Sequence, residues 1–273
     1  GTGESSRSTN SMADYLKAMD SVDRAITFAI AYGPDKRRGT EPDRFEWRRQ
    51  GWPERMNLND IAVEVARSAP GNKIVPFMAL HPFDPNMNDE YDRAVGDLGC
   101  KGLKLAPHGQ HFDPGSEEAF RLFARLEEDS LPVLIHGGTV GQGGGTLMNC
   151  HPLVFDRVAM AFPRLKMIVA HLAHPWQADC LALVRKHPNV WTEMSGQFYR
   201  QWSFWNGMRL FYEWGVTSKI MFASDWPLSD PQENIDGLRN LNKFAVDHHL
   251  PKIPDEEIEG IINRDAIDIL GID

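Results

Sequence analysis

The sequence has 273 residues, of which 42% are hydrophobic and 25% are charged, and its formal net charge is −9. This balance is typical of a soluble globular protein, and no apolar run approaches the roughly 20 residues that a membrane span needs. The acidic charge argues against nucleic acid or an anionic membrane surface as the main partner, so we expect a small-molecule ligand.

The three cysteines, Cys100, Cys150 and Cys180, are far apart, and none lies in a Cys-x-x-Cys spacing. An odd number of cysteines, so far apart in the sequence, argues against a disulfide framework. We therefore expect buried thiols and a cytoplasmic, reducing environment.

After a polar stretch at residues 1–10, hydrophobic periodicity predicts alternating helices and strands to the end of the chain. The predicted strands are 22–30, 73–80, 100–106, 132–136, 166–171, 190–195 and 220–225. The predicted helices are 12–19, 59–69, 89–98, 116–129, 152–162, 177–186, 203–214, 232–248 and 255–270. The alternation predicts an α/β fold with a parallel sheet, and the length suits a (β/α)8 TIM barrel formed by residues 1–273 as one domain. Seven strands are visible where a closed barrel needs eight, so the first strand is apparently missing, ahead of Ser11.

Two loops of unusual composition interrupt this pattern. Residues 33–56 are rich in charges of both signs and would lie over the reactive end of a barrel, where an Arg could meet a substrate carboxylate. The alternative is a solvated charged loop. The glycine-rich residues 137–145 lack the sequence of a phosphate-binding loop, and we interpret them as a flexible loop at the mouth.

Polar side chains close three of the predicted strands: His136, His171 and Asp225. A single His on an apolar strand is more often a hydrogen-bonded core residue than a ligand. Three such groups would meet at the same end of a parallel barrel. Burying them would cost free energy unless one common partner bound all three. Imidazole and carboxylate together suit a divalent ion, with zinc expected and manganese or iron as alternatives.

Lys104 and Glu193 are the charged residues whose strand parity points them into the barrel. The simplest interpretation is a structural ion pair between them. The functional alternative for Lys104 is a carboxylated lysine that bridges two metal ions.

Several segments together resemble the amidohydrolase superfamily in its amidohydrolase-2 branch. They are 102–105 (GLKL), 131–138 (LPVLIHGG), 162–173 (FPRLKMIVAHLA), 187–196 (HPNVWTEMSG) and 222–227 (FASDWP). The resemblance implies a (β/α)8 barrel, and the branch includes lactone hydrolases and metal-dependent decarboxylases of aromatic or unsaturated acids. It also implies that His136 is a metal ligand, that Asp225 is a ligand and proton acceptor, and that His171 is a ligand or an acid/base group.

One departure from the branch concerns its first strand, which ends in His-x-His. This chain has no His before His81. We expect the sequence to be an N-terminally truncated fragment whose coding sequence continues upstream into that strand. The alternative is a degenerate metal site in a non-catalytic barrel.

The sequence therefore predicts a metal-dependent hydrolase of a small lactone or carboxylic ester, in which Asp225 is the general base of a metal-activated water. A decarboxylase of an aromatic or unsaturated carboxylic acid is the alternative reaction. The substrate would be carboxylated or ring-containing, and a homo-oligomer remains open. The residues expected to bind substrate are Lys104, His174, Trp176, Trp226 and Arg200.

Overall fold

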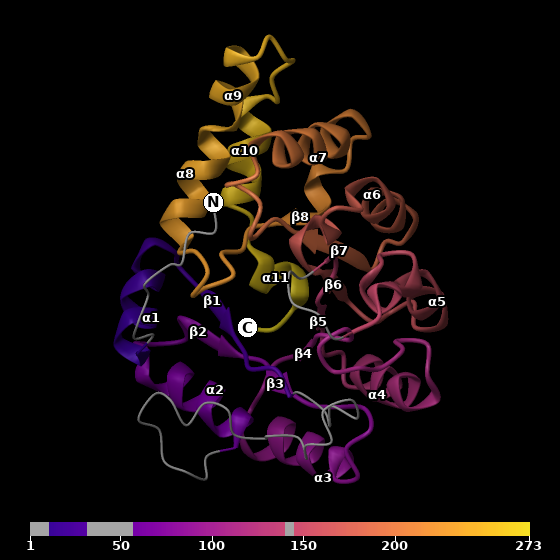
Figure 1. Ribbon diagram of the computed structural model, residues 1–273. Helices are drawn as coiled ribbons and strands as arrows, with labels where there is room; N and C mark the ends of the chain where they lie inside the picture. Colours follow the sequence, from indigo (N-terminus) through magenta and orange to yellow (C-terminus); the bar gives the residue numbers. More distant parts are fainter. Residues whose placement is uncertain (1–10, 32–56, 140–144) are drawn as a thin grey trace.

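A computed structural model describes residues 11–31, 57–139 and 145–273. A ring of short strands lies at the centre and helices surround it (Figure 1). Within these described ranges, no helix has both the length and the apolar character that crossing a membrane requires.

The strands run parallel and follow one another in chain order. They are β1 (Ala25–Thr27), β2 (Ile74–Pro76), β3 (Met78–Ala79), β4 (Leu103–Leu105), β5 (Val133–Ile135), β6 (Met167–Val169), β7 (Val190–Glu193) and β8 (Ile220–Met221). β1 pairs with β2, and β3 to β8 form the larger sheet. β2 and β3 are parts of one extended segment, because the Phe77 N–H donates to Thr27 O at 2.8 Å and the Met78 N–H donates to Gly102 O at 2.7 Å. The seven predicted strands are thereby confirmed.

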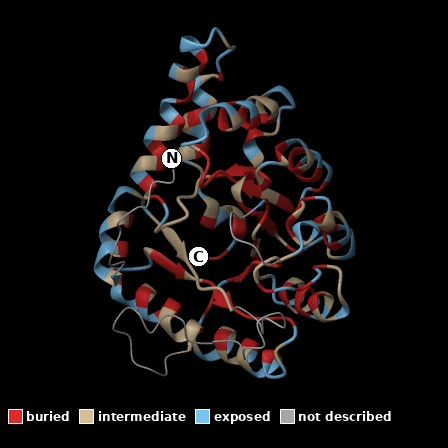
Figure 2. Ribbon diagram, viewed as in Figure 1, coloured by how far each residue is buried: buried red, intermediate tan, exposed pale blue. Residues whose placement is uncertain are grey.

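Helices cover the outside of the strands, with their exposed residues on the outer faces (Figure 2). They are α1 (Met12–Ala18), α2 (Leu58–Ser68), α3 (Met87–Asp92), α4 (Glu117–Glu128), α5 (Val154–Ala161), α6 (Gln177–Lys186), α7 (Gln201–Glu213), α8 (Pro231–Arg239), α9 (Leu241–Asp247), α10 (Asp255–Ile262) and α11 (Ala266–Leu270). The two predicted C-terminal helices, 232–248 and 255–270, were wrong as continuous elements. Each is broken into two, and α11 starts afresh because the Asp265 side chain accepts the Asp268 N–H at 3.0 Å.

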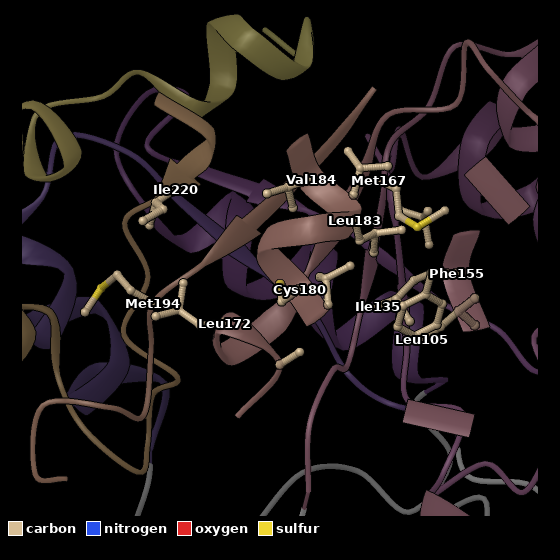
Figure 3. Packing of buried hydrophobic residues seen from close by; sticks show 14 of the residues in the cluster. Leu105, Ile135, Phe155, Met167, Leu172, Cys180, Leu183, Val184, Met194 and Ile220 are labelled. Atoms are coloured by element: carbon tan, nitrogen blue, oxygen red, sulfur yellow. The ribbon is translucent and has the colours of Figure 1, made fainter. Parts of the chain in front are cut away.

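The main hydrophobic core lies between the outer face of the strands and the helices. Leu105, Ile135 and Met167 from three neighbouring strands pack in the same cluster as Phe155 and Cys180 from the helices (Figure 3). All three cysteines are buried free thiols, as the sequence predicted.

The inside of the ring is filled at one end by the C-terminal helix α11 (Figure 1). Ile267 and Leu270 pack there against Phe77 and Ile168 from the strands. Lys166, just ahead of β6, donates to Ile269 O at 2.8 Å, so α11 closes the end where the strands begin. The opposite end, where the strands finish, remains available for a site.

Among the described residues, β1 and β8 each have one unpaired edge, so the barrel is open between them. A cavity of about 680 Å³ lies there, lined by residues 21–28 on one side and 221–227 on the other. It extends inward to the strand ends. This opening is where an eighth strand would complete the barrel.

Candidate active site

His171 lies on a tight turn directly after β6. Its φ is 61°, and Leu172 and Ala173 follow with φ of 50° and 49°. Left-handed conformations of residues other than glycine cost about 1–3 kcal/mol each and persist only where the surroundings hold them. Glu193, on the neighbouring strand β7, provides that support, because its Oε1 accepts the His171 N–H at 2.8 Å.

The imidazole of His171 is fixed through one nitrogen. Nδ1 lies 2.9 Å from Ser195 Oγ and 3.2 Å from Ser195 O. Glu193 also holds Ser195, since its Oε2 accepts the Ser195 N–H at 2.6 Å. No described residue hydrogen-bonds Nε2, so that nitrogen remains available to a ligand, as a metal-binding or acid/base role requires.

His136 ends β5, where its N–H donates to Leu105 O at 2.8 Å. Its ring centroid lies 4.9 Å from that of His171. Its Nε2 is buried and has no hydrogen-bond partner among the described residues. Burial first, and then the charges of His171, Lys104 and His108, hold the pKa of His136 well below its usual range. The imidazole is therefore neutral, the form that binds metal ions.

Asp225 follows β8 with φ of 58°. Burial raises the pKa of its carboxyl, and Glu193 also raises it, whereas His171 and Lys104 lower it. A Cβ placed on Gly196 would lie 3.7 Å from His171 Nδ1 and 3.8 Å from Asp225 Oδ2. The carboxylate and the imidazole therefore both lie beside Gly196.

Lys104 points into the barrel, as its strand parity predicted, but the predicted ion pair with Glu193 was wrong. No such pair forms within 4.0 Å among the described residues, since Glu193 is engaged by two backbone N–H groups instead. The Lys104 Nζ lies 4.9 Å from the centroid of the Phe28 ring. Burial lowers the pKa of Lys104 to about 8, although Glu193 and Asp225 oppose that shift.

The cavity of about 680 Å³ brings several of these groups together. Its lining includes Lys104, His171, Glu193 and Asp225 from the strand ends. Trp226 also lines it and packs edge-on against Tyr15, with ring centroids 5.1 Å apart. The charged segment predicted to lie over the mouth, residues 33–56, falls outside the described residues, as do positions 140–144 of the glycine-rich loop.

The other predicted substrate-binding residues lie outside the lining of this cavity. The His174 Nδ1 is 3.0 Å from Gln177 Nε2 and 3.1 Å from Ser203 Oγ. Trp176 packs against His151, with ring centroids 4.6 Å apart. Arg200 donates to Gly196 O at 2.7 Å, so it supports the loop beside the site.

The donors present fit a divalent ion in their chemistry. His136 contributes a buried nitrogen that has no partner among the described residues, and His171 and Asp225 belong to the same small group of strand ends. Within the described ranges, however, no three His, Cys, Asp or Glu side chains converge on one point as a complete ligand set. The described residues therefore do not by themselves form a complete metal site.

Two further residues lie near the site, and their positions after strand ends allow them to line its mouth or wall its pocket. The Tyr199 hydroxyl would lie 3.7 Å from a Cβ on Gly196, which places it near Asp225 and His171. The ring of His108 lies 4.6 Å from that of His136. Both residues occupy loops that follow strand ends, the one signal that could have identified them.

Comparisons with known proteins agree with this fold. A dihydroorotase from Helicobacter pylori (strain G27) is 27% identical over 127 residues, which covers 44% of this chain and 36% of that relative. The match thus spans little more than a third of the relative's length. Among solved structures, 2,6-dihydroxybenzoate decarboxylase from Rhizobium superposes with a TM-score of 0.64 at 18% identity, covering 96% of this chain and 88% of the other.

A probable 2-pyrone-4,6-dicarboxylic acid hydrolase from Acinetobacter baumannii superposes with a TM-score of 0.61 at 13% identity, covering 98% of this chain and 93% of the other. At these identities the similarity shows the fold, a TIM barrel. The profile of the amidohydrolase family matches residues 39–272. The chain therefore belongs to the amidohydrolase family, in the amidohydrolase-2 branch of its superfamily.

Proposed function

We propose that this protein is a metal-dependent hydrolase of a small lactone or carboxylic ester. The observation that carries the proposal is that Asp225 and His171 both line the cavity of about 680 Å³, and that Asp225 Oδ2 and His171 Nδ1 both lie beside Gly196. Ester hydrolysis needs room for a water molecule beside a carboxylate base, and the cavity lined by Asp225 has that room.

Asp225 would accept the proton of the attacking water. Burial raises the pKa of its carboxyl, which makes the ionised form a stronger base than an exposed aspartate. His171 is held rigidly by Ser195 and the Glu193 carboxylate, so its free nitrogen keeps a fixed position. A divalent ion held by His136, His171 and Asp225, expected to be zinc, supplies Lewis acidity to the substrate carbonyl when bound.

Lys104 would bind a carboxylate of the substrate. Its ammonium lines the cavity without a carboxylate partner within ion-pair distance among the described residues, so an anionic substrate would supply a charge partner. Phe28 and Trp226 offer apolar walls for a ring beside it. We retain His174, Trp176 and Arg200 as candidates for contact with the outer part of the substrate.

Decarboxylation of an aromatic or unsaturated acid is the second candidate function. The observation that favours it is the position of Lys104 against the Phe28 ring, which suits a carboxylate attached to a flat ring. The incomplete ligand set keeps a third alternative, a non-catalytic barrel. The three buried free thiols favour a reducing compartment, and we propose the cytoplasm.

The test is an assay of the full chain on a panel of small lactones and carboxylic esters, after loading with Zn²⁺, Mn²⁺ or Fe²⁺. We expect ring opening that a chelator abolishes and that the ion restores. Asp247→Asn, at an exposed position on α9, is the matched control for Asp225→Asn. Absence of hydrolysis with every ion, together with release of carbon dioxide from an aromatic acid, would establish the second candidate.

A further inference from the structure

His108 and His136 each have a buried ring nitrogen without a hydrogen-bond partner among the described residues. These atoms are His108 Nδ1 and His136 Nε2. The two rings lie side by side, with centroids 4.6 Å apart and an interplanar angle of 41°. An unpaired buried polar atom is costly, so two in adjacent side chains indicate a ligand that satisfies both.

Other buried histidines of the described chain show what a purely structural role looks like. The His81 Nε2 lies 2.7 Å from Gln110 O, and its Nδ1 accepts the Phe83 N–H at 3.1 Å. The His187 Nε2 lies 2.7 Å from Asp156 Oδ1. These imidazoles have protein partners, whereas His108 and His136 each have a buried nitrogen that no described residue pairs with.

The backbone of His108 is held in place by its surroundings. Gly145 packs so closely on it that a Cβ at Gly145 would overlap the His108 carbonyl group. The next ring beyond His136 is that of His171, 4.9 Å away. Three imidazoles from the ends of β4, β5 and β6 therefore form a continuous row, of which the sequence identified only two.

We propose that His108 donates a ring nitrogen, beside His136, to the divalent ion of this site. The inference rests on the proposed metal-dependent function. Imidazole nitrogens are preferred ligands of zinc and of related transition metals, and one ion would satisfy both unpaired nitrogens. His108 would be a ligand in addition to His136; with His108 included, no three His, Cys, Asp or Glu side chains of the described chain converge on one point.

The experiment titrates Co²⁺ into the metal-free full chain and follows its visible absorption, which reports both affinity and coordination. The variant His108→Phe keeps a flat ring beside His136 but removes the nitrogens. We expect its affinity for Co²⁺ to fall by about tenfold or more, with a changed spectrum. The control His248→Phe alters an exposed histidine next to α9 and should bind as the unaltered protein does.

Circular dichroism and a thermal melt of each metal-free variant separate lost binding from lost folding, and His108→Gln replaces His108→Phe if the latter does not fold. If His108 variants bind Co²⁺ normally while His136→Phe weakens binding, the His108 inference is overturned and the proposed metal site stands. If the unaltered chain binds no Co²⁺, or His136→Phe binds it equally well, the proposed metal site fails and the inference fails with it.

Discussion

The carboxylate of Glu193 fixes the position of His171. Its Oε1 accepts the His171 N–H at 2.8 Å, and its Oε2 accepts the Ser195 N–H at 2.6 Å. Both carboxylate oxygens therefore accept hydrogen bonds from backbone N–H groups beside the site. The sequence identified Glu193 as inward-facing but assigned it to Lys104, whereas its actual role is to hold the strained turn after β6.

We expect Glu193→Gln to destabilise the protein by about 1–3 kcal/mol, because the amide nitrogen cannot accept and one buried N–H loses its partner. Urea unfolding monitored by circular dichroism measures this change. Glu128→Gln, at an exposed position on α4, is the control and should change stability by less than about 0.5 kcal/mol. Equal stability of the two variants would show that the Glu193 contacts do not hold the turn.

Asp225→Asn should lower kcat by about 10²-fold or more, since an amide cannot accept the proton of the attacking water. Steady-state kinetics on whichever lactone or ester the panel identifies would measure it. A variant that retains most of the kcat would remove Asp225 from the role of general base.

Lys104 predicts a pH dependence of substrate binding. Its pKa is lowered to about 8, so the ammonium is present below that pH and is lost as the pH rises through it. The KM for a carboxylated substrate should therefore rise above about pH 8. Lys104→Met should raise KM at neutral pH and abolish this dependence, whereas Lys101→Met, at an exposed neighbouring position, should do neither. A KM that stays constant from pH 7 to 9.5 in the unaltered protein would contradict this role.

His136 predicts a dependence of stability on pH. Its pKa is held well below the value of about 6.5 in an unfolded chain, so below that pH the unfolded state binds a proton that the folded state does not. The free energy of unfolding should therefore fall by roughly 1.4 kcal/mol per pH unit from this group as the pH drops below about 6.5. Urea unfolding at pH 7 and pH 5 measures how much stability the metal-free protein and the His136→Phe variant each lose on acidification. The variant should lose less stability on acidification, and equal losses would contradict the account.

Much of the fold was predictable because the strands are short, largely apolar runs separated by helical patterns, and three of them stop at a polar residue. The seven strands and their parallel order follow from that pattern, as do the helices between them. The breaks at Asn240 and near Asp265 were missed because apolar residues keep helical spacing across both positions. Only the local capping by Asp265 shows that the last helix begins anew.

The site was predictable where side chains end strands, as with His136, His171 and Asp225. The partner of Glu193 was missed because parity shows only which face a side chain occupies, not which of several donors it meets. For His108 and Tyr199 the sequence showed only that they follow strand ends and could line the mouth or the pocket, because loop conformation places them and no periodicity describes a loop. His174, Trp176 and Arg200 were expected in contact with substrate from their nearness in sequence to strand ends, and that contact stays a prediction.

The most direct test of the account is to run the reaction of the metal-loaded full chain in ¹⁸O-labelled water and to analyse the product by mass spectrometry. Hydrolysis of a lactone or ester predicts one ¹⁸O atom in the new carboxylate, with formation of that product lost in Asp225→Asn and after chelation. Carbon dioxide released from an aromatic acid, with no lactone opened by any metal form, would contradict the central claim.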